Sequence, residues 1–409
     1  MKYAVVTFGC RVNQADSLAI ERDFLGRGAV AVRPDEADVV VVNTCSVTAS
    51  ADQGARQVIR RIARSNPSAR VVVTGCYATR RPDAIAELPN VAAIVRNPDK
   101  DALVDIVAGD MGLPTAARFG AGEGPCGLPL APGVAGRTAL TLRIQTGCDE
   151  QCSYCIIPST RGPGRSKPPA QALADIRTAV AAGYKEIVLT GVHLGSYGRD
   201  LPERASLTAL VRHLAGWPDA VLFRISSLEP MDCTTELVDA IASSPRLAPH
   251  FHLPLQHGAD EMLRAMQRPY TAAAYARLVD RIRRVMPHAS IGSDVIVGFP
   301  GESAQHFAEM RTVLDSLPLT HLHVFPYSDR PGTVASVMRD KVDGAAVRAR
   351  GAEVRAIGEQ MARRFRASLQ GTVRPALTVD DGLSAVTDNY LKVRLDRKHP
   401  RNEWIEVTV

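Results

Sequence analysis

The chain has 409 residues and a formal net charge of +6, and 45% of its residues are apolar. This length and composition favour a globular protein of two or three domains, and no apolar run approaches the length of a membrane span, so no membrane role is expected. Residues 1–8 lack the long apolar core of a secretory signal. We therefore expect a cytoplasmic, reducing location. In such a location the eight cysteines are interpreted as metal ligands or catalytic thiols in preference to disulfides.

The N-terminal region, residues 1–112, alternates short apolar strands with helical segments, which predicts an α/β domain with a parallel, doubly wound sheet. The predicted strands and helices are, in chain order, Tyr3–Phe8, Gln14–Gly28, Asp38–Val42, Ser50–Ser65, Arg70–Thr74 and Pro82–Leu88. Cys10, Cys45 and Cys76 each follow one of the three strands, and the carboxyl ends of parallel strands gather at one edge of a sheet. We interpret the three as ligands of a four-iron cluster with one open iron; for any one of them alone, a small apolar residue at a strand end is the alternative.

Residues 113–136 are rich in Gly, Pro and Ala, which predicts a linker between domains. Cys126 lies in this linker and is interpreted as a free thiol, with transient cluster ligation or sulfur transfer as the alternative. Cys233 has no partner at ligand spacing, so we expect it to be structural.

The most informative pattern is Cys148-x3-Cys152-x2-Cys155, directly after the strand-like segment Leu140–Thr146. Four thiolates normally hold an Fe–S cluster, so three with no fourth cysteine nearby leave one iron open to a small molecule. S-adenosylmethionine (SAM) is the natural candidate, because its amino and carboxylate groups can chelate that iron and its reductive cleavage gives a 5′-deoxyadenosyl radical. Tyr154 is expected to pack near the SAM adenine or to be a core aromatic. A zinc site is the alternative, although it would require a fourth ligand.

Residues 137–340 contain a second β/α series, which predicts a partial (β/α)6 barrel with its chemistry at the carboxyl ends of the strands. The predicted strands are Leu140–Gln145, Glu186–Thr190, Val221–Ser226, His250–Leu255, Ser290–Val297 and His321–Phe325. Gly191 and Gly298 follow strands and would let the backbone approach a ligand closely, or are plain turn glycines. Glu229 and Gln256 could bind the amino group or ribose of SAM, or could close polar networks at the barrel mouth.

Several histidines lie in or just after the predicted barrel strands, among them the pairs His252/His257 and His321/His323. They resemble metal ligands at first, but period-two spacing merely places His321 and His323 on one face of a strand. Packed or hydrogen-bonded histidines are therefore favoured.

The C-terminal region begins with a helical connector, residues 341–369, and ends in residues 370–409, which break into short strands. The predicted strands are Val373–Val379, Leu383–Thr387, Tyr390–Leu395 and Trp404–Val407. They suit a small antiparallel barrel or sheet. Tyr390, Lys392 and Arg394 combine a stacking surface with positive charge, as an RNA-binding surface would; ordinary strand alternation is the alternative.

Together these motifs resemble the radical SAM methylthiotransferase family over nearly the whole chain. The strings that carry the resemblance are Thr7–Gln14, Asn43–Cys45, Thr74–Tyr77, Gly147–Gly162 and Ile296–Glu302. The resemblance implies that the N-terminal trio of cysteines holds an auxiliary [4Fe–4S] cluster, that the second trio holds the radical SAM [4Fe–4S] cluster, and that a C-terminal TRAM domain binds RNA.

Within the family, three strings resemble the branch that modifies threonylcarbamoyladenosine in tRNA: Ile187–Gly195, Arg224–Pro230 and His323–Ser328. The resemblance implies conversion of N6-threonylcarbamoyladenosine at position 37, beside the anticodon, to its 2-methylthio derivative. Isopentenyladenosine in tRNA and a ribosomal-protein aspartate are alternative substrates, and a non-catalytic Fe–S protein that binds RNA is the alternative of another class. Two features depart from the family pattern: His257 stands where Ser is common, and the TRAM-like tail is short.

The mechanism implied is cleavage of SAM at the second trio, removal of hydrogen from carbon 2 of the adenine, and transfer of sulfur from the auxiliary cluster after methylation by a second SAM. Arg161, Arg165 and Lys167 follow the radical cluster and are expected to hold phosphates of the anticodon stem-loop, or to form a solvated basic loop. The other expected partners are an electron donor such as flavodoxin or ferredoxin and proteins that deliver Fe–S clusters and sulfur. We expect a monomer.

Overall fold

The computed structural model describes residues 1–110, 132, 138–203 and 205–409, which form two compact units. The first unit comprises Met1–Leu130 with two later segments, Gly147–Glu150 and Cys155–Pro163. The second comprises Ala131–Thr146, Gln151–Tyr154 and Gly164–Val409. Most of the predicted linker, including Cys126, lies outside the described residues.

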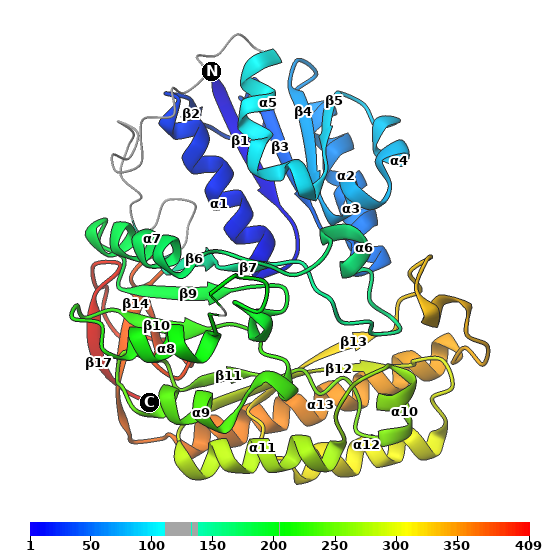
Figure 1. Ribbon diagram of the computed structural model, residues 1–409, viewed down its shortest axis with the longest axis vertical. Helices are drawn as coiled ribbons and strands as arrows, with labels where there is room; N and C mark the ends of the chain where they lie inside the picture. Colours follow the sequence, from blue (N-terminus) through cyan, green and yellow to red (C-terminus); the bar gives the residue numbers. More distant parts are fainter. Residues whose placement is uncertain (111–131, 133–137, 204) are drawn as a thin grey trace. The chain divides into compact units, whose positions relative to one another are not determined.

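The first unit is a five-stranded parallel sheet in the order β2-β1-β3-β4-β5, with helices on both faces (Figure 1). Its elements are β1 Lys2–Thr7, α1 Arg11–Gly26, β2 Val30–Ala31, β3 Val39–Thr44, α2 Ala49–Ser65, β4 Arg70–Gly75, α3 Cys76–Arg80, α4 Pro82–Ala86, β5 Val91–Val95, η1 Asn97–Ala102, α5 Leu103–Asp110 and α6 Ile157–Arg161. The predicted α/β class and doubly wound sheet are confirmed, and the sheet has two edge strands, β2 and β5, that the sequence did not predict.

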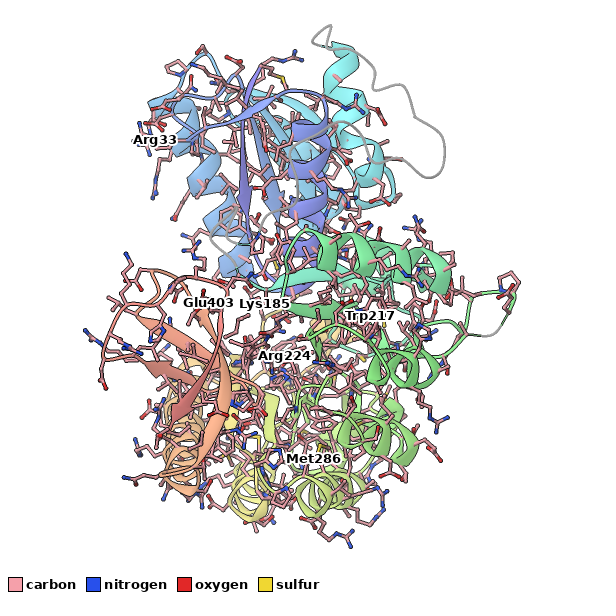
Figure 2. All side chains as sticks on the ribbon, turned by 90° about the vertical axis from the view of Figure 1, so that its left-hand side faces the viewer. Arg33, Lys185, Trp217, Arg224, Met286 and Glu403 are labelled. Carbon is pink, nitrogen blue, oxygen red and sulfur yellow. The ribbon has the colours of Figure 1, made fainter. Side chains whose placement is uncertain are left out.

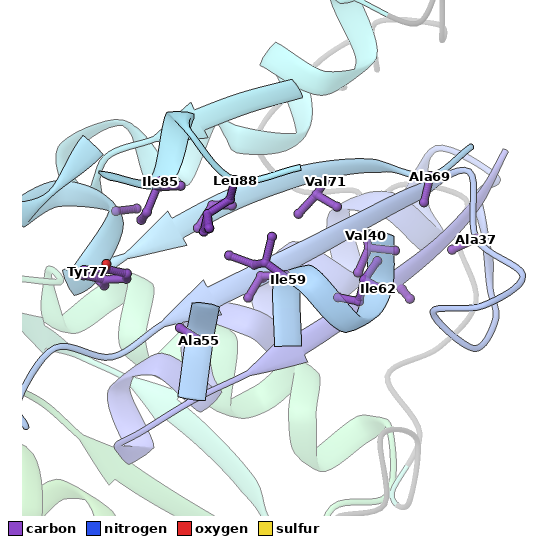
Figure 3. Close-up of a cluster of buried hydrophobic side chains, with 14 residues drawn as sticks. Ala37, Val40, Ala55, Ile59, Ile62, Ala69, Val71, Tyr77, Ile85 and Leu88 are labelled. Atoms are coloured by element: carbon purple, nitrogen blue, oxygen red, sulfur yellow. The ribbon is translucent and has the colours of Figure 1, made fainter. Parts of the chain in front are cut away.

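Alternation along the central strands divides the core of the first unit into two layers. Val40 of β3 turns towards Ile59 of α2 (Figure 3), and Val42 belongs to the same buried cluster. Val39 and Val41 pack with α1 and α5 on the other face. Because both faces are covered, β3 is buried at every position, as expected for a central parallel strand.

The strand order of this sheet decides where a ligand can bind. β1 lies between β2 and β3, so the order reverses between β1 and β3, and ligands of such sheets bind beyond the carboxyl ends of the strands at this reversal. The ends are level: Thr7 of β1 lies opposite Asn43, and Thr44 of β3 opposite Gly75 of β4. The loops that follow these three strands therefore begin at one edge.

The second unit contains the barrel strands, their helices and a C-terminal sheet. Its elements are β6 Leu140–Arg143, β7 Gln145–Thr146, β8 Arg165–Ser166, α7 Pro169–Ala181, β9 Glu186–Thr190, η3 Leu194–Ser196, α8 Leu207–Ala215, β10 Leu222–Ile225, η4 Pro230–Asp232, α9 Thr235–Ala242, β11 His250–His252, α10 Asp260–Ala265, α11 Ala272–Val285, β12 Ser290–Val297, α12 Ala304–Ser316, β13 His321–Pro326, η5 Val334–Val337, α13 Gly344–Ser368, β14 Val373–Val379, β15 Ser384–Thr387, β16 Lys392–Arg394 and β17 Trp404–Thr408. Among the described residues, no helix has the length and apolar character that a membrane crossing requires.

Six parallel strands of this unit follow one another in chain order, as a partial (β/α)6 barrel requires. They pair as two three-stranded sheets, β6-β9-β10 and β11-β12-β13, and a bridge between Ser227 and His252 joins the two. The helix predicted as a connector, α13, lies along the last strand: Leu322 of β13 packs against Gly358, where a Cβ atom would be 3.1 Å away. This helix therefore covers the barrel in addition to leading out of it.

The C-terminal sheet is antiparallel, in the order β16-β15-β14-β17, and packs around a small core of Ala376, Ala385 and Val407. Side-chain hydrogen bonds connect it to the rest of its unit. The side chain of Asn389 is fully buried and donates to the carbonyl of His288 at 2.9 Å. Asn402 likewise donates to the carbonyl of Gly183 at 2.8 Å.

Arg224 of β10 links the barrel to the C-terminal sheet from the interior of the second unit (Figure 2). Its side chain is fully buried, and its Nε donates to Glu186 at 2.7 Å. Its Nη1 donates to the carbonyl of Asp388, and its guanidinium lies 4.8 Å from the ring centre of Tyr390. A buried cation needs partners of this kind, because burial without them would be costly.

Candidate functional site

The three cysteines of the first unit lie at the carboxyl edge of its sheet. Cys10 caps α1 and is exposed, whereas Cys45 and Cys76 are buried. Burial, with a smaller contribution from the charges of Cys10 and Cys76, raises the pKa of Cys45 to about 11. The three thiols are thus close enough to influence one another, as the sequence predicted.

Side chains of the same motifs tie the three loops together. The amide nitrogen of Asn13 donates to the carbonyls of Phe8 and Thr44, at 2.8 and 2.9 Å, which joins the loop of Cys10 to that of Cys45. The hydroxyl of Thr44 donates to the carbonyl of Thr74 at 2.6 Å and accepts from the N–H of Ala78 at 3.2 Å. These bonds connect the three loops to one another.

Gly9 allows the loop of Cys10 to lie close to the side chain of Cys45. Its φ is +91°, and a Cβ atom there would lie 2.6 Å from Cβ of Cys45 and 2.7 Å from its sulfur. Any larger residue would strain the backbone and displace the Cys45 side chain.

A buried charge cluster of Asp16, Lys100 and Arg161 adjoins the thiols. Oδ2 of Asp16 accepts from Lys100 at 2.8 Å and from Arg161 at 3.1 Å, and the three side chains are at most 3% exposed. Burial disfavours the charge of Arg161, but Asp16 and then the thiols of Cys76 and Cys10 raise its pKa above the ordinary value. Burial lowers the pKa of Lys100, although Asp16 acts in the opposite direction.

Arg161 therefore does not occupy the exposed position predicted for a phosphate contact. Its guanidinium is buried, donates to Asn13 as well as to Asp16, and lies within hydrogen-bond reach of Cys76. This corrects the expectation that Arg161 holds RNA, because a side chain with this environment is not available to a phosphate in solution.

The donor set at this edge fits an Fe–S cluster. Three thiols gather where parallel sheets bind ligands, and the excess positive charge of Arg161 and Lys100 over Asp16 would offset the negative charge of thiolates. Asn97 adds a donor, because its amide nitrogen lies 3.7 Å from the sulfur of Cys76.

Two cysteines of the second trio, Cys148 and Cys155, belong to the first unit and are half-buried. The N–H of Cys148 donates to the carbonyl of Gly162 at 3.1 Å, and the sulfur of Cys155 accepts from the N–H of Ile157 at 3.5 Å. Backbone donors to sulfur are typical of Fe–S sites, where they stabilise the anionic ligands.

The third member, Cys152, belongs to the second unit, where its sulfur accepts from Nη1 of Arg268 at 2.8 Å. The same guanidinium pairs with Glu229. Burial disfavours the charge of Arg268, but Glu229 raises its pKa above the ordinary value. Glu229 thus belongs to the polar network around Cys152, the second of the two roles expected for it.

Tyr154 packs in an apolar cluster beside Cys152. Its ring meets that of Phe299 edge to face, with centroids 6.5 Å apart, and Ile296 and Met266 belong to the same cluster. The preceding residue is fixed as well, because Ser153 donates to the carbonyls of Met266 and Ala265. A core aromatic is therefore the observed environment of Tyr154.

The two glycines expected to face a ligand are required by protein neighbours. A Cβ atom on Gly191 would lie 2.8 Å from Oε1 of Gln145, and one on Gly298, where φ is +77°, would lie 2.4 Å from Val347. Gln256 is half-buried with φ of +69°, and its carbonyl accepts from Ile296 at 2.8 Å. Its backbone is thus held in an unusual conformation at the end of the barrel strands.

His257, the departure from the family pattern, is fully buried and has partners. Its Nδ1 accepts from the N–H of Ala259 at 3.0 Å, and its Nε2 lies 3.5 Å from Glu302. Glu302 in turn accepts from the N–H of Gly298 at 2.7 Å and from Arg350 at 2.6 Å. The larger residue therefore joins a network that supports the Gly298 loop.

The other residues expected to contact RNA differ in availability. Arg165 and Arg394 are exposed, and Lys167 pairs with Asp175. Lys392 pairs with Asp380 at 2.7 Å, but both side chains are more than half exposed. Tyr390 lies in a turn before β16 and is 43% exposed, although its ring also contacts Arg224 and His250.

Three further features were not predicted from the sequence. The charge cluster of Asp16 and Lys100 is one, and a group of two histidines and Asp294 on the barrel strands is another. The third is a pocket of about 280 Å³ on the first unit, lined by Asp52, Arg56, Arg60, Tyr77, Arg81, Ala84, Glu87 and Leu88. Arginine spacing along α2 was the available signal for the pocket.

Cys233 is buried, and burial raises its pKa to about 12, so its thiol is not poised for reaction. This environment agrees with the structural role expected for it.

Comparison with known proteins identifies the family. A family model described as Radical SAM superfamily matches residues 142–314, and one described as Uncharacterized protein family UPF0004 matches residues 2–96. The threonylcarbamoyladenosine tRNA methylthiotransferase MtaB of Bacillus subtilis is 34% identical over 407 residues, which cover 95% of this chain and 88% of that protein. The chain belongs to the radical SAM methylthiotransferase family. Its family makes it a transferase that uses SAM and a [4Fe–4S] cluster.

Other members of this family are about equally similar. The enzyme of the same name from Aquifex aeolicus is 34% identical over 413 residues, 96% of each chain. The tRNA-2-methylthio-N(6)-dimethylallyladenosine synthase of Herpetosiphon aurantiacus is 34% identical over 343 residues, 82% of this chain and 76% of that one. Among solved structures, the radical SAM methyltransferase TsrM of Kitasatospora setae matches with a TM-score of 0.57 at 17% identity, covering 82% of this chain and 74% of that one, which supports the fold.

Proposed function

We propose that this chain adds a methylthio group to carbon 2 of N6-threonylcarbamoyladenosine at position 37 of tRNA, next to the anticodon. The observation that carries the proposal is the 34% identity, over 95% and 96% of the chain, to relatives named for threonylcarbamoyladenosine. The gathering of Cys10, Cys45 and Cys76 at one edge of a sheet supports it, because sulfur insertion needs a second, auxiliary cluster besides the one that binds SAM.

In this proposal Cys148, Cys152 and Cys155 hold the cluster that binds SAM. When reduced and bound to SAM, that cluster would supply the radical chemistry needed to remove the unactivated hydrogen of carbon 2, which acid–base chemistry cannot remove. Arg268 supports Cys152 by donating to its sulfur, and its pairing with Glu229 fixes the guanidinium. The apolar packing of Tyr154 against Phe299 keeps water from this side of the loop.

Cys10, Cys45 and Cys76 hold the auxiliary cluster. As a ligand Cys45 would be a thiolate, although burial raises the pKa of its thiol. Arg161, which approaches Cys76, stabilises the thiolates electrostatically, and Asp16 fixes its position. Asn13 and Thr44 preorganise the three loops for this cluster.

RNA contacts are assigned to the exposed basic residues that remain after the correction of Arg161. Arg165 and Lys167 supply phosphate contacts from the loop after the second trio, and Lys392 and Arg394 supply them from the C-terminal sheet. Tyr390 offers part of its ring for stacking. The chain also requires an electron donor, such as flavodoxin or ferredoxin, and proteins that restore the cluster and its sulfur, because each turnover consumes electrons and one sulfur atom.

The test is product analysis. The protein is reconstituted without oxygen and given SAM, a reductant and tRNA that carries threonylcarbamoyladenosine, and the RNA is then digested and its nucleosides identified by mass. We expect the threonylcarbamoyladenosine peak to gain the mass of a methylthio group. The same assay with Cys148→Ala, which removes one proposed ligand, controls for chemistry that does not depend on the radical.

A second candidate substrate is isopentenyladenosine in tRNA, since a relative named for the dimethylallyl nucleoside is also 34% identical over 82% of the chain. Running both tRNAs in one assay separates the candidates. A methylthio gain on the isopentenyl nucleoside alone would transfer the assignment, and intact SAM with both tRNAs would contradict any radical function.

A further inference from the structure

Two histidines and an aspartate of the second unit bring their ligand atoms together on three neighbouring strands. His252 lies on β11, Asp294 on β12 and His323 on β13. Oδ1 of Asp294 is 2.9 Å from Nε2 of His252 and 3.0 Å from Nδ1 of His323, and the three ligand atoms lie within 4.8 Å of one another. We infer that His252, Asp294 and His323 form a binding site for a divalent transition-metal ion.

The spacing of these atoms suits a metal ion as well as a hydrogen bond. Two ligands each about 2.1 Å from one ion and at right angles to each other are roughly 3.0 Å apart, which is the separation observed for both histidines. Two imidazoles and one carboxylate on a single side of an ion are a common set for iron, manganese, cobalt and zinc, and they leave further coordination positions open. The His323 side chain is 55% exposed, so an ion can enter from solvent.

The open positions face the same side of the sheet as the loop of Cys152. Leu322 packs on Gly358 of α13, so strand alternation turns His323 away from that helix. Asp294 lies two residues before Ile296 on β12 and therefore on the same face, and Ile296 packs in the apolar cluster that contains Tyr154. A metal ion held here would thus face the interior of the partial barrel, where substrates of such folds bind.

His321 is next to this group but is engaged elsewhere. Its Nδ1 is 3.0 Å from the hydroxyl of Thr320, and a Cβ atom on Gly292 would lie 2.0 Å from its Nε2. The absence of a side chain at Gly292 therefore makes room for the His321 ring, and His321 is not among the residues whose ligand atoms lie within 4.8 Å of one another. His321 is the matched control for His323, two residues away on the same face of β13.

The ligand class for the open positions follows from charge. Asp294 alone would repel an anion, whereas a divalent ion held by His252, Asp294 and His323 would attract a carboxylate. If the proposed function holds, on which this step rests, that carboxylate is the one on the threonyl group of the modified adenosine. The isopentenyl nucleoside has no such group, so the metal ion would contribute to the choice between the two substrates.

The test uses Mn²⁺ with the oxidised, cluster-loaded protein and follows the signal of free Mn²⁺ by electron paramagnetic resonance. We expect one ion per chain, and a dissociation constant raised at least about tenfold by Asp294→Asn and by His323→Gln. His321→Gln should keep the dissociation constant within about twofold of the unmodified protein. Zn²⁺ should release the bound Mn²⁺, because it binds nitrogen ligands more tightly.

Absence of Mn²⁺ binding, or binding in Asp294→Asn and His323→Gln as strong as in the unmodified protein, would overturn the metal site whatever the activity of the enzyme. Iron and sulfide contents measured in each variant separate loss of the site from loss of the clusters. In a second arm, free N6-threonylcarbamoyladenosine should raise the Mn²⁺ affinity, whereas adenosine should not, because coupling between two ligands is reciprocal. An equal response to both nucleosides would overturn the carboxylate assignment, and neither result depends on turnover.

Discussion

The two trios of cysteines are built in different ways. Cys10, Cys45 and Cys76 are each separated by more than thirty residues and are brought to one edge by the parallel strands β1, β3 and β4. Cys148, Cys152 and Cys155 lie within eight residues of one loop. The first trio therefore depends on the fold of the whole sheet, and the second depends mainly on local spacing.

This difference determines which substitutions should damage each site. A residue that fixes the sheet or its loops, such as Asn13, can affect the first trio without being a ligand. The second trio should tolerate such changes, because its nearest supports are backbone groups and Arg268. The direct test is to measure, for each variant, how much cluster each of the two trios holds.

The largest effects should come from the ligands themselves. In Cys10→Ala, Cys45→Ala and Cys76→Ala combined, we expect iron to fall from about eight to about four atoms per chain. Methylthiolated product should disappear while reductive cleavage of SAM continues, because the second trio remains. Iron analysis measures the loss of the first cluster, and the release of 5′-deoxyadenosine measures the cleavage of SAM. Retention of all the iron would contradict the assignment of the first trio.

The next largest effect should come from Asp16→Ala, which leaves Lys100 and Arg161 as two buried cations. Removing one partner of a buried ion pair typically costs about 3–5 kcal/mol, so the first unit should lose most of its stability. Hydrogen exchange of the amides of β3 and β4 would report this loss. Asp105→Ala breaks an ion pair whose carboxylate is 57% exposed and should cost at most about 1 kcal/mol.

Equal protection of β3 in Asp16→Ala and Asp105→Ala would mean that the buried charges do not support the sheet.

Much of the fold followed from pattern, because strand alternation and strand–helix order are local properties of the sequence. The central strands of both units and the C-terminal antiparallel strands were predicted within a few residues. β2 has only two residues and lies at an edge, so it carries almost no pattern. α13 was predicted as a helix, but its contact with β13 depends on Leu322 and Gly358, which are 36 residues apart and share no local signal.

The cluster ligands could be predicted from the spacing of the cysteines. The roles of residues whose partners are distant in sequence could not. Arg161 follows a cluster motif and looks like a solvated cation, but its partner Asp16 is 145 residues away. Gly298 likewise looks like a ligand-facing glycine, whereas Val347 of α13 occupies the space beside it. His252 and His323 were interpreted as packed histidines, and only the pairing of three strands brings them to Asp294.

Gly9→Ala, which adds a single methyl group, should affect the first trio of cysteines and not the second. The residue has a φ of +91°, which costs an alanine about 1–3 kcal/mol, and the new Cβ atom would displace Cys45. Iron in the first trio should fall, with the second trio unaffected. Gly28→Ala is the matched control, because its φ is +76° but nothing lies within 4 Å of the new atom. Equal iron contents in the two variants would show that Cys45 tolerates the contact.

The smallest effect should come from substitutions that touch neither trio. Lys392→Ala with Arg394→Ala removes two exposed cations proposed to contact phosphates, so the slope of log affinity against log salt for tRNA should shrink by roughly 1.4 to 1.8. Arg33→Ala with Arg363→Ala removes the same charge from exposed positions without a proposed RNA role. The slope should be unchanged in this control, and all four positions should leave the iron content intact. An equal reduction of the slope in both double variants would mean that tRNA affinity depends only on the net charge of the protein. A specific contact would instead depend on the position of the cation.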